Sequence, residues 1–203
     1  MVGFWSLLRD GRRYWVAMLG LAAIGTGSAL FHGTLLRFAQ AADELPMLGV
    51  GLACVWALVR DASPAWVGDR LAHVLGLFGA GFVVAYATVP WAFALFVGVY
   101  GVMIAWVALQ TARLTWLAPS SPEMKRSALA MLLSFGTAFF VFWLGEHVYL
   151  PCDHPLQALQ PHSYWHVLGA LGTVAWWRWE RASRGCGRGT WWAVSRRPCR
   201  STS

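Results

Sequence analysis

The chain has 203 residues, of which 58% are hydrophobic and 12% are charged, against roughly 25% charged in a typical soluble domain. A soluble fold of this length has too much surface for so few charged side chains to cover. The composition therefore excludes that class and predicts an all-α, multi-pass integral membrane protein. The formal net charge of +7 could suggest a nucleic-acid partner, but the placement of the basic residues argues against one.

Six apolar segments follow one another along the chain, and a helix needs about 20 such residues to cross a bilayer. The second segment is short, so its polar start at Asp43 and Glu44 is expected to lie within the membrane boundary. We expect one membrane domain over residues 1–180 and a flexible basic tail over residues 181–203. The six segments cover residues 14–36, 43–59, 71–88, 91–109, 127–150 and 162–179.

The basic residues are distributed unevenly between the two sides of the predicted bundle. All of the 16 Lys and Arg residues except Arg37 fall on the side that holds the N-terminus. Because cytoplasmic loops carry the excess of Lys and Arg, this count predicts that both termini are cytoplasmic. The basic surplus is then a topology signal, helped by anionic lipid headgroups, and no nucleic-acid partner is expected.

Polar side chains are predicted to gather at the outer end of the bundle, where three segments meet. Ser28 and His32 lie near the outer end of the first segment, and Asp43 lies at the start of the second. His162 and His166 open the last segment. Ser28 and His32 are four residues apart, as are the two later histidines, so each pair shares one helix face.

These residue types suit a zinc-dependent hydrolase that acts on an amide or an ester. Ionisable groups in spanning helices usually face a partner, a cavity or a pathway. Zinc held by three histidines keeps a fourth position for water, whose pKa it lowers to about 7. A carboxylate could transfer the water's proton, and a serine hydroxyl could donate to the oxyanion.

Simpler interpretations of the same residues stay open. His32 taken alone could bond a carbonyl or another helix, and an HxxxH pair alone is a weak signal. Gly25 and Gly27 fit helix packing better than chemistry. Glu146 could accept a hydrogen bond from a ligand histidine and so orient it, or it could be an ordinary interfacial glutamate.

Three blocks of the sequence resemble the alkaline ceramidases, a family of intramembrane zinc amidases. GTGSALFHGTLLRFAQAADELPML, from residue 25 to 48, is similar to one family signature, with a serine four before a histidine and an aspartate eleven after it. HSYWHVLGALGTVAW, from residue 162, is similar to the C-terminal signature. FFVFWLGEHVYLPC resembles a third block, with Glu146 where the family usually has aspartate. The resemblance covers roughly residues 9 to 180.

This resemblance implies a fold, a zinc site and a reaction. The fold is a seven-helix bundle, and His32, His162 and His166 would hold Zn²⁺. Asp43 would transfer protons and Ser28 would support the oxyanion. The implied reaction hydrolyses the amide of ceramide, a membrane lipid, to a sphingoid base and a fatty acid. The metal site would lie near the lumenal or extracytoplasmic side, in the endoplasmic reticulum or Golgi if the source is eukaryotic.

The chain departs from the family pattern at its start, which falls close to where the family's first helix would end. We therefore expect six spanning helices rather than seven, and no family calcium site, since calcium binds the acidic stretch before that helix. Three alternatives stay open: a receptor-like relative with a structural zinc, a related lipid-ester hydrolase, and an inactive shortened relative.

Overall fold

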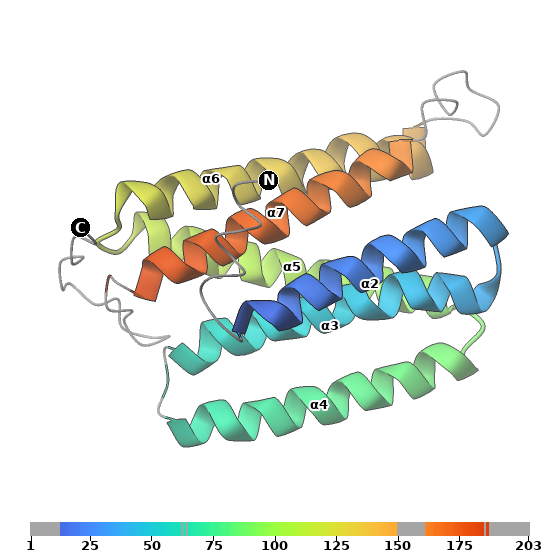
Figure 1. The fold of residues 1–203 in the computed structure, drawn as a ribbon, viewed down its shortest axis with the longest axis horizontal. Helices are drawn as coiled ribbons and strands as arrows, with labels where there is room; N and C mark the ends of the chain where they lie inside the picture. Colours follow the sequence, from blue (N-terminus) through green and yellow to red (C-terminus); the bar gives the residue numbers. More distant parts are fainter. Residues whose placement is uncertain (1–12, 62, 64, 150–160, 185, 187–203) are drawn as a thin grey trace. The chain divides into compact units, whose positions relative to one another are not determined.

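The computed structural model is all-helical, without strands, in the residues that it describes, which are 13–61, 63, 65–149, 161–184 and 186 (Figure 1). Six helical stretches follow one another in this range, which confirms the predicted fold class. The elements are α2 (Arg13–Thr34), α3 (Arg37–Asp61), α4 (Ala65–Thr88), α5 (Ala92–Trp116), α6 (Pro122–Gly136) with the π-helices η1 (Thr137–Trp143) and η2 (Gly145–Tyr149), and α7 (Pro161–Arg184). The tail predicted from residue 181 lies outside the described residues, apart from the end of α7 and Cys186.

Four stretches of the described chain are long and apolar enough to cross a membrane. They are Arg37–Arg60, Arg70–Thr88, Ala92–Trp116 and Pro122–Val148. Several apolar crossings of this length identify a multi-pass helical membrane protein. That α2 and α7 also cross the membrane stays a prediction.

The described residues fall into two compact units, the first ending at Gln110 and the second beginning at Thr111. In the first unit, α2 packs along α3 and α3 packs against α4, and the first two helices run side by side in Figure 1. Gly27 marks the closest approach of α2 to α3: a Cβ at this position would strike the carbonyl of Ala42 and lie 2.7 Å from the backbone nitrogen of Asp43. The packing role predicted for Gly27 is confirmed. The same prediction for Gly25 finds no support among the described residues, since a Cβ there would meet none of them within 4 Å.

A short turn at Leu35 joins α2 to α3. Leu35 adopts a positive φ of 55°, a conformation that costs most residues roughly 1–2 kcal/mol, and its N–H donates to the carbonyl of Phe31 at 2.7 Å. The next helix begins at Arg37, six residues before the predicted start at residue 43. Residues 37–42 include polar side chains, so an apolar scan stops short of them, although nothing in them prevents a helix. Asp43 therefore lies in the second turn of α3 and not at its entrance.

The second unit is built around the pairing of α6, η1 and α7. Ser121 caps α6 by accepting from the N–H of Met124 at 3.2 Å, and Pro122 follows at the first helical position, as helix starts favour. Two indole N–H groups of α7 donate to buried threonine hydroxyls: Trp176 to Thr111 at 2.9 Å and Trp179 to Thr115 at 2.7 Å. These bonds satisfy polar groups that would be costly to bury alone.

Candidate metal centre

The first candidate pair, His32 and Asp43, forms where α2 and α3 meet at the short turn. A ring nitrogen of His32 and a carboxylate oxygen of Asp43 lie within 4.8 Å of each other. Asp43 is 3% exposed, whereas His32 is exposed, with its ring 5.3 Å from that of Phe31. Ser28 lies one turn before His32 on α2 and is half-buried. The turn at Leu35 and the close approach at Gly27 together bring these residues to one end of the helix pair.

The second candidate pair, His162 and His166, lies in the first two turns of α7. Their ring centroids are 4.8 Å apart with an angle of 61° between the planes, and a ligand nitrogen of each lies within 4.8 Å of the other. This arrangement confirms that the i, i+4 spacing places both rings on one face. Both side chains are half-buried.

Glu146 contacts one histidine of this pair. Its Oε2 lies 3.2 Å from Nδ1 of His162; that it orients a metal-ligating histidine stays a prediction. A proton on Nδ1 donated to this carboxylate leaves Nε2 unprotonated and able to act as a ligand atom, the usual arrangement behind a metal-binding histidine. Glu146 lies in η2, and π-helical turns are rare and often occur at functional sites.

Aromatic side chains flank the second pair. Trp143 stacks on the ring of His147 at 4.6 Å, and Phe142 stacks on Tyr164 at 5.1 Å. Nδ1 of His147 lies 2.9 Å from the carbonyl oxygen of Trp143. His147 is therefore held against its own helical segment, and it is exposed.

The donors in these pairs fit zinc by their chemistry. Imidazole nitrogens and a carboxylate oxygen are common Zn²⁺ ligands at about 2.0–2.2 Å, so two ligands of one tetrahedral ion lie roughly 3.4 Å apart. The separations within each pair, below 4.8 Å, reach that value with small side-chain rotations. The structure thus brings His32 together with Asp43 in one unit, and His162 together with His166 in the other.

Glu44 makes buried polar contacts, and the sequence alone assigned no role to this residue. Its carboxylate is 5% exposed and accepts from the hydroxyl of Tyr86 at 2.6 Å and from Nε2 of Gln40 at 2.8 Å. The i, i+4 spacing of Gln40 and Glu44 was visible in the sequence, but the bond to Tyr86, 42 residues away, was not.

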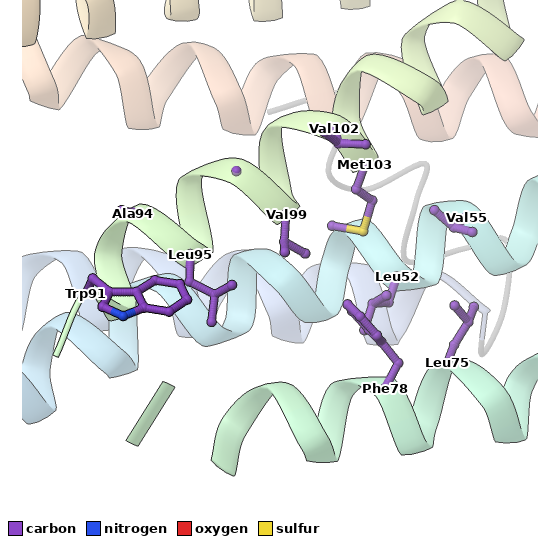
Figure 2. A pocket seen from close by; sticks show the side chains of 11 residues that line it. Leu52, Val55, Leu75, Phe78, Trp91, Ala94, Leu95, Val99, Val102 and Met103 are labelled. Carbon is purple, nitrogen blue, oxygen red and sulfur yellow. The ribbon is translucent and has the colours of Figure 1, made fainter. Parts of the chain in front are cut away.

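A groove of about 760 Å³ lies among α3, α4 and α5 of the first unit (Figure 2). This volume is within the range of small-ligand pockets, and none of the described residues that line it has a charged or hydroxyl-bearing side chain. Such a lining suits an alkyl chain. The lining residues are Leu52, Val55, Leu75, Phe78, Trp91, Ala94, Leu95, Gly98, Val99, Val102 and Met103.

Apolar helices that carry histidine and carboxylate pairs define the general class: a multi-pass membrane protein with donors for a metal ion. The family model described as Ceramidase matches residues 2–191, so the chain belongs to the ceramidase family, as the sequence blocks predicted.

Two relatives illustrate the match. The chain is 28% identical over 187 residues to alkaline ceramidase YPC1 of Saccharomyces cerevisiae, covering 79% of this chain and 58% of the relative. It is 26% identical over 177 residues to alkaline ceramidase 3 of Mus musculus, covering 80% of this chain and 63% of the relative. The chain thus spans about three fifths of the length of these relatives.

Proposed function

We propose that the protein is a zinc-dependent amidase that hydrolyses ceramide to a sphingoid base and a free fatty acid. The observation that carries this proposal is the buried carboxylate of Asp43 beside His32, in a chain that matches the ceramidase family over residues 2–191. In this proposal His32, His162 and His166 are the ligands of a single ion. When bound, zinc supplies the Lewis acidity that makes water nucleophilic near neutral pH and polarises an amide carbonyl.

The proton movements are assigned to Asp43. Its carboxylate takes a proton from the attacking water as the water oxygen bonds to the carbonyl carbon. The same proton then passes to the amide nitrogen as the carbon–nitrogen bond breaks, so the amine leaves neutral. Burial of Asp43, which is 3% exposed, keeps bulk water from competing for this proton.

Two further side chains have supporting roles. The hydroxyl of Ser28, one turn from His32, donates to the oxygen that gains negative charge during the attack. Glu146 accepts from Nδ1 of His162 at 3.2 Å and so fixes the tautomer that leaves Nε2 for the metal.

The apolar groove of the first unit is proposed to hold one alkyl chain of the lipid. Leu52, in its lining, follows Asp43 by nine residues on α3, about 13 Å along the helix axis. A lipid chain spans roughly 15 Å, half of the hydrocarbon core of a bilayer. The amide of a lipid seated in the groove can therefore lie near the level of Asp43.

The test of this function is the reaction catalysed by the purified, zinc-loaded protein. We expect a long-chain ceramide to give equimolar sphingoid base and fatty acid, with an acceleration over the uncatalysed reaction at least about tenfold greater than for a lipid ester with matched chains, a difference of ~1.4 kcal/mol in activation free energy. Hydrolysis of the ester with no release of sphingoid base from ceramide would assign the protein to another lipid hydrolase class. Bound zinc without hydrolysis of either lipid would indicate a structural site.

A further inference from the structure

Glu44 is a buried carboxylate that belongs to neither candidate pair, yet it follows Asp43 directly in the chain. The hydroxyl of Tyr86 donates to its Oε2 and the side chain of Gln40 donates to its Oε1. Both Glu44 and Tyr86 are almost fully buried, at 5% and 4% exposed. Since a buried carboxylate is costly unless it is hydrogen-bonded, these two donors hold Glu44 in one orientation.

Asp43 and Glu44 project from α3 in different directions. Successive residues of an α-helix are rotated by about 100°. Asp43 lies on the side of α2, where its carboxylate is near His32 and its backbone nitrogen is near Gly27. Glu44 is bonded to Tyr86 in the last turn of α4. Any rotation of α3 about its axis would therefore move both carboxylates together.

The backbone of α3 lacks one helical hydrogen bond at this turn. Pro46 lies inside the helix and has no N–H to donate to the carbonyl of Ala42. The bond between Gln40 and Glu44 spans the same turn through side chains. A further hydrogen bond, from Nη2 of Arg37 to the carbonyl of Val89 at 3.1 Å, holds the start of α3 against the end of α4.

We propose that Glu44, held by Tyr86 and Gln40, is a positioning residue that fixes the rotation of α3 and thereby directs the Asp43 carboxylate toward His32. This inference rests on the proposed function, because its consequence is the efficiency of proton transfer by Asp43. Glu44 itself neither binds the metal nor carries the proton.

The first test removes the hydroxyl of Tyr86 and leaves every proposed site residue in place. In the zinc-loaded 203-residue chain, we expect Tyr86→Phe to lower kcat for ceramide about tenfold, the effect of losing one buried hydrogen bond, with KM and zinc content unchanged. Thr88→Val is the matched control, since it removes a hydroxyl from the same turn of α4. Among the described residues, this hydroxyl bonds to carbonyls of its own helix alone, those of Val84 and Ala85. An unchanged kcat in Tyr86→Phe would overturn the proposal, as would a parallel loss of zinc.

The second test separates positioning from chemistry at Glu44. A glutamine can accept from Tyr86 through its carbonyl and donate to the side-chain oxygen of Gln40, so Glu44→Gln preserves both bonds without a charge. We expect Glu44→Gln to keep kcat within about threefold of the parent and Glu44→Ala to lower it by tenfold or more. Equal inactivity of both variants with zinc retained would make Glu44 a catalytic carboxylate and overturn the positioning role.

A third readout does not depend on ceramide. Amide hydrogen exchange over residues 38–48 should be faster in Tyr86→Phe than in the parent, and unchanged in Thr88→Val, because local opening reports the stability of that turn. If the parent hydrolyses no ceramide, the proposed function fails, and the exchange result alone decides whether Tyr86 anchors α3. Unchanged exchange in Tyr86→Phe would overturn the anchor in either case.

Discussion

Asp43 is the residue on which the proposed chemistry depends most directly. It is 3% exposed and lies within 4.8 Å of a ring nitrogen of His32. We expect Asp43→Asn to keep bound zinc, because three histidines remain, and to lower kcat for ceramide by roughly 10²–10⁴-fold, the usual contribution of a general acid–base group. Metal analysis and kinetics on the same preparation check this. Loss of zinc together with activity would make Asp43 a metal ligand.

Glu146 offers a second test at the scale of single residues. Removing a group that orients a metal-bound histidine typically weakens metal affinity 10- to 100-fold, so we expect that loss in Glu146→Ala, measured by competition with a chelator. Glu123→Ala is the control, because Glu123 is an exposed partner of Arg181 at 3.8 Å on the same unit. Equal zinc affinities in the two variants would show that Glu146 does not support the metal site.

At the scale of elements, the contact between α2 and α3 positions His32 and Asp43. Gly27 and Gly25 form a matched pair of substitution sites, because an added Cβ clashes at the first and meets open space at the second. We expect Gly27→Ala to destabilise the protein by about 1–3 kcal/mol through overpacking, and Gly25→Ala to be neutral or stabilising by up to ~1 kcal/mol. Thermal melts in detergent compare the two. Equal melting temperatures would contradict the close approach at Gly27.

Sequence patterns predicted the elements better than their contacts. Apolar runs indicated the six helical stretches of the described residues, because burial in lipid requires long uninterrupted stretches of this kind. They misplaced the start of α3, because its first residues include the polar Arg37 and Gln40. Within the fold, Arg37 donates a hydrogen bond to Val89 and Gln40 donates one to Glu44. The spacing of His162 and His166 was sufficient to predict a shared face. The bond from Tyr86 to Glu44 and the π-helical turn at Glu146 depend on tertiary packing, which no local pattern records.

At the scale of the whole molecule, the proposed orientation places both termini in the cytoplasm, and the single membrane domain over residues 1–180 stays a prediction. We expect a single cysteine at Ser63, between α3 and α4, to react with an impermeant thiol reagent only from the cytoplasmic side. A single cysteine at Val89, between α4 and α5, should react only from the opposite side. Both variants are made in a background without the native cysteines. Labelling of each cysteine from the other side of the membrane would contradict the predicted orientation.

The proposed function requires that His32, His162 and His166 bind one and the same metal ion. The most direct measurement is the number of zinc ions per chain in the purified parent and in the variants His32→Ala and His166→Ala, with His73→Ala, an exposed histidine of α4, as the control. We predict one zinc per chain in the parent and in the control, and a loss of that zinc in both of the other variants, because three-ligand sites rarely survive the removal of one ligand. Retention of zinc in either His32→Ala or His166→Ala would contradict a shared centre.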